Sequence, residues 1–307
     1  MEKNMQKESK LRFVITTLII FFLISSVISF FIYGSEEISG NVALIKIRGV
    51  ISTDKEDSFS RTTTSSIEVI KLIEKAEESP NIKAILFDIN SPGGSPVGSK
   101  EIGDAIKRAK KPTFSLIHEI GASGAYWIAS STDYIIANDL SITGSIGVIS
   151  SYIEFEGLLK KYNMTYQRMV GGEYKDIGDP LRKLSDEERD ILQKKIDKIH
   201  NYFIGIVAKN RNMSFEKAEE LSTGEFYLGS EALELGLVDE LGDSETAKEA
   251  IKQKLNITEV DFIEYSTPKS FFDVLSGVFS DNSFLVGKGI GSAITGQSDI
   301  NKPLINT

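Results

Sequence analysis

Ser123 lies among small residues, at a point where an apolar strand is expected to pass into a helix. The run is Gly121–Ala125, or GASGA. A serine in such a junction can expose its hydroxyl where free backbone amides stabilise an oxyanion. The run is similar to the G-x-S-x-G turn of nucleophilic serines, with Ala125 in place of the last glycine. A tight turn in which small residues only permit close packing is the alternative.

A pair of glycines, Gly93 and Gly94, follows the apolar stretch Ile82–Ile89. Adjacent glycines allow a backbone N–H to point into a cleft, as an oxyanion hole or a site for an extended peptide requires. An ordinary turn between a strand and a helix would have the same composition. The glycine pair therefore indicates a candidate substrate site, but an ordinary turn explains it equally well.

Lys175 is a candidate general base, in the segment Glu173–Gly178 (EYKDIG). A lysine accepts a proton only when it is neutral, and at a reference pKa of about 10.4 roughly one in 2,500 is neutral at pH 7. Bringing a lysine pKa to about 7 takes roughly 4–5 kcal/mol, which desolvation in an apolar pocket can supply. A surface lysine beside Asp176 is the alternative.

Other catalytic groups are scarce. The chain has 307 residues, no cysteine and two histidines, His118 and His200, which excludes thiol catalysis and most zinc sites. A Ser-His-Asp triad could pair Ser123 with either histidine. His200 falls inside a long predicted helix, however, and His118 lies too close along the chain to Ser123, so an imidazole base is disfavoured. We expect no metal and no cofactor.

The net charge argues against one class of partner. The chain carries a formal charge of −9 and has a pI near 5. A protein that binds nucleic acid needs a cationic face for the phosphate backbone. We therefore expect no nucleic-acid partner.

The elements that must position these residues alternate along the chain. Apolar runs predict strands at Asn41–Ile51, Ile82–Ile89, Thr113–Glu119, Tyr134–Ala137 and Met164–Val170. Helical spacing predicts helices at Ser65–Glu78, from the SPGGSP segment to Lys110, and at Phe155–Tyr162, Ser214–Leu221, Ser230–Leu235 and Thr246–Lys254. A capping box at Ser185–Glu188 opens a further long helix to about Asn210. Such alternation is typical of βαβ units and a largely parallel sheet.

An uncharged run, Phe13–Tyr33, precedes this domain. Its 21 residues would span roughly 31 Å as a helix, which matches the apolar core of a bilayer. Lysines and an arginine precede the run and Glu36 and Glu37 follow it, so the positive-inside rule places residues 1–12 in the cytoplasm. We expect a single-pass anchor in the cell membrane with the remaining chain outside the cytoplasm. A cleaved signal peptide is the alternative.

Together these segments resemble the signal peptide peptidase family SppA, membrane-bound serine proteases with a ClpP/crotonase-like fold. The matching stretches are IKAILFDINSPGGSPVGS, GASGAYWIAS, SITGSIGVI, YKDIGDPLRKLSDEER and GLVDELG, between about Asn41 and Gly242. The resemblance implies an α/β fold, a βαβ superhelix with a parallel-sheet core, preceded by one transmembrane helix. The expected divisions are a cytoplasmic segment 1–12, an anchor 13–33, a linker 34–40, a peptidase domain 41–254 and a poorly ordered or docking tail 255–307.

The resemblance also implies roles for single residues. Ser123 would be the nucleophile, Lys175 the general base and Ser145 the hydroxyl that orients the lysine. Backbone amides around Gly93, Gly94 and Gly124 would form the oxyanion hole and the substrate cradle. The chain has SGAY where SGGY is commoner, and this exchange is tolerable if the backbone at Ala125 does not need a positive φ.

The expected activity is cleavage of peptide bonds through an acyl-enzyme, with signal peptides left in the bilayer as substrates. Long members of the family have two tandem repeats, and this chain resembles the short form with one. We therefore expect a homo-oligomeric ring in which neighbouring subunits share each dyad. An inactive ClpP-like scaffold that binds membrane segments is the first alternative, and an acyl-CoA enzyme of the same fold is the second.

Overall fold

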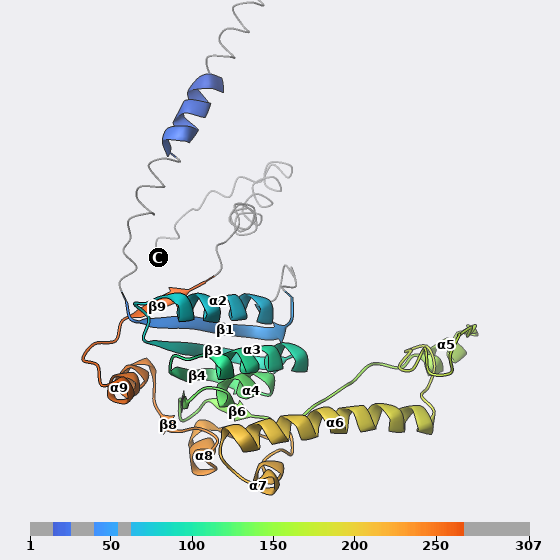
Figure 1. Cartoon of the computed structure of the whole chain (residues 1–307). Coiled ribbons are helices and arrows are strands. Elements are labelled where there is room, and N and C mark those ends of the chain that lie inside the picture. Colours follow the sequence, from blue (N-terminus) through green and yellow to red (C-terminus); the bar gives the residue numbers. More distant parts are fainter. Residues whose placement is uncertain (1–14, 26–39, 55–62, 267–307) are drawn as a thin grey trace, which may run out of the picture. The chain divides into compact units, whose positions relative to one another are not determined.

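The computed structural model describes residues 15–25, 40–54 and 63–266, and its centre is a mostly parallel β-sheet (Figure 1). The strands run in the order β2-β1-β3-β4-β5-β8, with every neighbouring pair on this path parallel. Their bounds are β1 (Val42–Ser52), β2 (Thr63–Ser65), β3 (Ala84–Gly94), β4 (Thr113–Ala122), β5 (Tyr134–Ala137) and β8 (Glu240–Leu241). The expected parallel α/β fold is confirmed.

Three short strands lie off this path. β6 (Ile142–Gly144) pairs in parallel with the end of β4 and antiparallel with β7 (Phe226–Leu228). β9 (Phe262–Tyr265) pairs in parallel with the start of β1. The sheet therefore continues past residue 254, where the sequence places the end of the domain.

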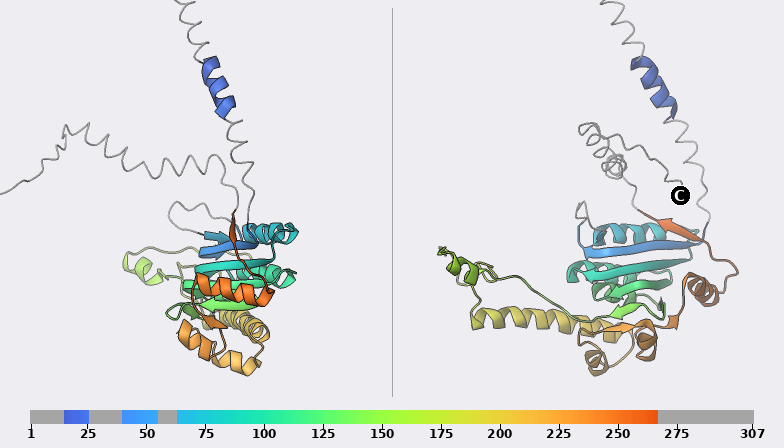
Figure 2. Two further views of the ribbon diagram at one scale, coloured as in Figure 1. Left: turned by 90° about the vertical axis from the view of Figure 1, so that its left-hand side faces the viewer. Right: turned by 180° about the vertical axis from the view of Figure 1, so that it is seen from behind.

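Both faces of the sheet are covered, as its apolar strands require. In β1, Ala43, Ile45 and Ile47 belong to the main core, whereas Val42 and Leu44 belong to a second core on the opposite face. Residues of α2 (Ser66–Glu78), α3 (Pro96–Arg108) and α4 (Gly124–Ser130) complete the main core, and residues of α9 (Ser244–Leu255) complete the second. Figure 2 shows the helices on the two sides of the sheet.

The helix starts follow local chemistry. The Ser65 and Ser95 side chains cap α2 and α3 by accepting hydrogen bonds from backbone amides three residues later. The capping box predicted at Ser185 and Glu188 is confirmed at the start of α6 (Asp186–Asn210). The remaining helices are α5 (Glu156–Lys161), α7 (Phe215–Glu220) and α8 (Gly229–Glu234).

Residues 149–198 form an arm, a stretch that includes α5 and the first half of α6. Every residue of this stretch is described, and Glu188 is the only buried one. The core contacts of α6 begin only at Phe203 and continue through Val207. Figures 1 and 2 show α5 at the end of α6 that lies away from the sheet.

The strand predicted at Met164–Val170 is wrong. These residues have no regular secondary structure and are exposed, apart from a half-buried Tyr166. Their alternating apolar side chains suit a strand, but the arm brings no second strand alongside them. A strand needs a hydrogen-bonded neighbour, which local pattern alone does not supply.

The predicted anchor 13–33 is described only over residues 15–25, which are helical. Within the described ranges, no helix combines the length and the apolar character needed to cross a bilayer. The predicted cytoplasmic segment 1–12, most of the linker 34–40 and residues 267–307 of the tail lie outside the described residues.

Candidate active site

Ser123 joins β4 to α4 in a backbone conformation that is rare for a residue with a side chain. Its φ is 53° and its ψ is −123°. Its amide donates to the Gly144 carbonyl at 2.8 Å, and its carbonyl accepts from the Trp127 amide at 3.0 Å. From Gly121 to Ser130, Ser123 is the only residue that is not buried. Such strain persists where surrounding contacts enforce it, and it often marks functional sites.

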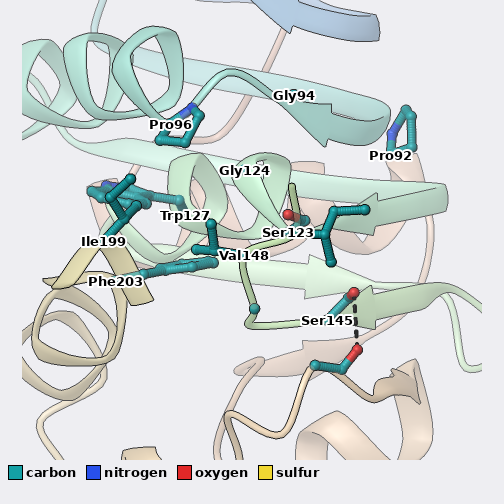
Figure 3. Close-up of a pocket in the computed structure, with 13 residues that line it drawn as sticks. Pro92, Gly94, Pro96, Ser123, Gly124, Trp127, Ser145, Val148, Ile199 and Phe203 are labelled. Carbon is teal, nitrogen blue, oxygen red and sulfur yellow. Dashed lines mark hydrogen bonds between the residues drawn. The ribbon is translucent and has the colours of Figure 1, made fainter. Parts of the chain in front are cut away.

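A pocket of about 320 Å³ opens beside Ser123. In Figure 3, Ser123 and Ser145 lie toward one end of this pocket, and Trp127, Ile199 and Phe203 lie toward the other. The structure thus brings together four of the predicted site residues, Ser123, Ser145, Gly94 and Gly124. The full lining is Pro92, Gly94, Pro96, Ser123, Gly124, Trp127, Ser145, Gly147, Val148, Ile149, Ile199, Phe203 and Gly224.

The predicted glycines are needed because two backbones approach closely here. Gly93 has φ +97°, and a Cβ at this position would lie 2.7 Å from the Gly124 nitrogen. A Cβ at Gly124 would lie 2.2 Å from Ser99 Oγ and 3.3 Å from the Gly94 nitrogen. The backbone at Gly93 and Gly94 therefore approaches the backbone at Gly124 closely, beside Ser123, and amides at this place could stabilise an oxyanion.

Ala125 fits this site without strain. It lies inside α4, is fully buried and does not have a positive φ. The expectation that alanine is tolerated in SGAY is therefore confirmed for the backbone.

Ser145 lies on the opposite side of the pocket from β3. Its φ is 48°, and its amide donates to the Glu225 carbonyl at 2.9 Å. Its hydroxyl donates to the Gly224 carbonyl at 3.2 Å (Figure 3). Ser145 therefore presents a second, half-exposed hydroxyl to the pocket that contains Ser123.

The two histidines do not line this pocket. The His118 ring contacts the Asp88 carboxylate, and Asp88 also pairs with Arg48 at 2.5 Å. His200 Nε2 lies 3.2 Å from the Ile146 carbonyl oxygen. Neither imidazole therefore completes a triad with Ser123. Within the described ranges, no group of three or more acidic or histidine side chains could hold a metal ion.

Lys175 is not brought to Ser123 within one chain. It is exposed in a turn of the arm, and the neighbouring Tyr174 hydroxyl donates to Glu187 at 2.6 Å, at the start of α6. Phe203, which lines the pocket, follows Glu187 by sixteen residues on the same helix, or about 24 Å at 1.5 Å per residue. A lysine side chain reaches only about 6 Å. The arm therefore holds Lys175 out of reach of its own Ser123.

The sequence did not indicate the apolar end of the pocket. The Trp127 and Phe203 rings stack with centroids 4.8 Å apart and an interplanar angle of 20°. Ile199 and Phe203 are four residues apart on one face of α6, a spacing visible in the sequence. Their contact with Trp127 joins positions far apart along the chain, which periodicity cannot predict.

The sequence of this chain is similar to those of known peptidases. The model of peptidase family S49 matches residues 105–258. A relative from Methanocaldococcus jannaschii, named as a protease, is 34% identical over 76% of this chain and 75% of its own. A relative from Enterococcus faecium, named as a signal peptide peptidase SppA, is 34% identical over 78% of this chain and 74% of its own. Protease 4 of Haemophilus influenzae is 31% identical over 71% of this chain, a match that covers 35% of its own length.

Solved structures share the fold. A serine-to-alanine mutant of the 1510-N membrane-bound stomatin-specific protease matches 75% of this chain with a TM-score of 0.52 at 16% identity. A lysine-to-alanine mutant of that protease, in complex with a substrate peptide, matches 79% of this chain with a TM-score of 0.52 at 18% identity. At this identity the likeness concerns the fold alone.

Proposed function

The chain belongs to peptidase family S49 and is a serine protease, and from this premise we propose that it is an endopeptidase with a Ser123–Lys175 dyad. The observation that carries this proposal is the geometry at Ser123. A strained serine opens into a pocket that Gly94 and Gly124 also line, and no imidazole lines that pocket. A serine in this setting needs a base from another element.

The proposed reaction follows from these positions. Neutral Lys175 Nζ accepts the Ser123 proton as Oγ attacks the carbonyl carbon of the peptide. The Gly94 and Gly124 amides stabilise the oxyanion, and the lysine then gives its proton to the departing amine. Water hydrolyses the acyl-enzyme by the same route. Ser145, beside Ser123 in the pocket, orients the lysine by hydrogen bonding.

We propose that another copy of the chain supplies Lys175. The arm that carries Lys175 exposes large apolar side chains, with Ile149 and Met169 each 91% exposed and Ile153 72% exposed. Exposed apolar side chains gathered on one segment are typical of a binding surface. A contact in which the arm of one copy covers the pocket of the next is heterologous, and it closes into a ring if the rotation allows. Desolvation of the lysine in that contact would favour its neutral form.

We propose cleaved signal peptides and similar apolar segments as substrates. Trp127, Phe203 and Val148 line the pocket and suit an apolar side chain next to the bond that is cut. The uncharged run 13–33 and its flanking charges support a membrane anchor with the catalytic domain outside the cytoplasm. An enzyme tethered in this way would meet apolar peptides that remain in the bilayer.

The test is peptide cleavage by the full chain in detergent. The substrates are a signal-peptide-like peptide and a polar peptide of equal length, and the enzymes are wild type, Ser123→Ala and Lys175→Ala. Lys252→Ala on α9 is the matched control, because it removes a half-buried lysine that pairs with Glu249, away from the pocket. We expect wild type and the control to cut the apolar peptide and both dyad variants to be inactive. Full activity in either dyad variant, or no cleavage by wild type, would overturn the proposal.

A further inference from the structure

Asp176, the residue after Lys175, is bound by two arginines at once. Arg168 Nε and Nη2 donate to its two carboxylate oxygens at 2.7 and 2.8 Å. Arg182 Nε and Nη2 donate to the same two oxygens, each at 3.0 Å. The Asp176 carboxylate is therefore held in two paired contacts, the geometry in which guanidinium and carboxylate groups bind most strongly.

The contacts continue from Arg182 into the first turn of α6. Arg182 donates to the two carboxylate oxygens of Glu188 at 2.8 and 2.5 Å. Glu188 in turn accepts from the Ser185 amide at 2.9 Å as part of the capping box. We call Arg168, Asp176, Arg182 and Glu188 the arm network. This network ties the turn that carries Lys175 to the rigid start of a long helix.

The arm has no apolar core that could do the same work. Glu188 is its only buried residue, and the Asp176 and Arg182 side chains are 12% and 18% exposed. Isolated surface ion pairs contribute little, whereas a network with paired geometry can order a segment. The arm network therefore constrains the backbone at Lys175, together with the hydrogen bond from Tyr174 to Glu187.

The charges of the arm network cancel, with two guanidinium and two carboxylate groups. Both oxygens of Asp176 are occupied by arginine, and the arginines hold the pKa of Asp176 below its usual range. In the described part of the chain, Lys175 Nζ has no ion pair with a carboxylate. Without the arginines, the Asp176 carboxylate would be free to pair with the adjacent ammonium of Lys175. The nearby acidic groups Glu173 and Asp179 are further sources of negative charge.

We propose that Asp176, bound between Arg168 and Arg182, is a positioning residue for Lys175. It sets the direction in which the Lys175 side chain extends from the arm and the charge around the amino group of that lysine. This inference rests on the proposed role of Lys175 as the base. The two arginines hold Asp176 in place and neutralise its charge. Lys175 then extends from a fixed turn toward the pocket of another copy, without a carboxylate partner of its own.

The test measures steady-state cleavage against pH for Asp176→Asn and Arg168→Gln. Misplacement of a catalytic group by about an ångström costs up to roughly a hundredfold, so we expect kcat to fall about 10- to 100-fold with KM within about twofold. Removing the carboxylate leaves excess positive charge, which should shift the acidic limb of the pH–rate profile to lower pH by about half a unit. Removing the guanidinium leaves excess negative charge and should shift it by a similar amount to higher pH.

Two further variants separate positioning from loss of structure. Asp176→Glu keeps the charge, so its acidic limb should return to the wild-type pH. Glu249→Gln, which breaks an exposed ion pair on α9, should leave both kcat and the limb unchanged. The arm contributes no residue to the core, and the core contacts of α6 begin after it, at Phe203, so the sheet domain should stay folded by circular dichroism in every variant.

The outcomes are distinct. Opposite shifts of the acidic limb, together with a fall in kcat, would support the positioning role. If Asp176→Asn and Arg168→Gln both kept the wild-type kcat and an unshifted acidic limb, while Lys175→Ala was inactive, the positioning role would be overturned and the proposed function would stand. A loss of the oligomer with unchanged kcat in the molecules still assembled would also overturn it. Full activity of Lys175→Ala would overturn the proposed function itself.

Discussion

Replacement of Ile199 should change which peptides are cut without unfolding the domain. Ile199 lies on α6 at the apolar end of the pocket and is 38% exposed. Trp127, Phe203 and Val148 line the same pocket. Substitutions at such partly exposed positions usually change stability only slightly. Ile199→Asn therefore probes the lining of the pocket.

The magnitude follows from the burial of a substrate side chain. Moving a leucine side chain from water into an apolar site stabilises it by about 1.5–3 kcal/mol. If an amide in place of one apolar wall removes about half of this, about 0.75–1.5 kcal/mol is lost, which is roughly a four- to twelvefold change. The loss applies only to a substrate whose side chain enters the pocket.

The assay compares kcat/KM for two peptides that differ by leucine or alanine at the residue before the bond that is cut. For Ile199→Asn we expect the leucine-to-alanine ratio of kcat/KM to fall roughly four- to twelvefold, with kcat/KM for the alanine peptide within about twofold of wild type. Ile199→Val, which stays apolar, should keep the ratio within about twofold. An unchanged ratio, or an equal fall for both peptides, would refute the assignment of this pocket to the substrate side chain.

Three further results are expected. Gly94→Ala should abolish most activity, because its Cβ would lie 2.1 Å from the Ile51 carbonyl oxygen and displace the Gly94 amide; full activity in the peptide assay would contradict this. The Arg182 hydrogen bonds lower the pKa of Glu188 to about 2, so this carboxyl stabilises the arm above its usual pKa and loses that effect as pH falls from about 4.5 toward 2. The hydrogen-exchange protection factors of amides in residues 171–190 should therefore fall in this window, and constant protection factors would refute the role of the ion pair. Tyr126→Phe should lower the free energy of unfolding by about 1–2 kcal/mol, because the fully buried hydroxyl donates to a backbone carbonyl at 2.8 Å; an unchanged denaturant midpoint would contradict this.

Local chemistry was sufficient to predict most of the sheet domain. The apolar run at β3, the exact span of β5 and the capping box of α6 follow from residues close together in sequence. The pairing of β9 with β1 joins residues more than two hundred positions apart. The four residues of β9 carry only a weak strand pattern, so the sequence predicts a domain that ends at residue 254, before this strand.

The arm was beyond prediction for a related reason. Residues 164–170 have the alternation of a strand, yet their environment is decided by the absence of a neighbouring strand in the arm and by the hydrogen bonds of Arg168. Such contacts depend on where the chain turns after α5. Periodicity reports which face of a segment is apolar, but it does not report what lies against that face.

The candidate site also has a part that the sequence predicts and a part that depends on the fold. Small residues made Ser123, Gly94 and Gly124 candidates, although close packing in an ordinary turn would explain the same composition. The roles expected for these residues and for Ser145 came from the family resemblance, and the structure places all four around one pocket. The distance between Lys175 and Ser123 within one chain depends on the length and direction of α6, which local patterns do not give, so only the family resemblance led to the expectation of a shared dyad. This separation is the reason why the proposal requires a second copy of the chain.

The most direct measurement mixes Ser123→Ala chains with Lys175→Ala chains and assays peptide cleavage. Each variant alone should be inactive. If the serine of one copy works with the lysine of the next, random assembly at equal amounts restores about a quarter of the sites, because each partner is intact in about half of them. Recovery near that level is the result we expect. No recovery in assemblies shown to contain both chains would contradict the shared site.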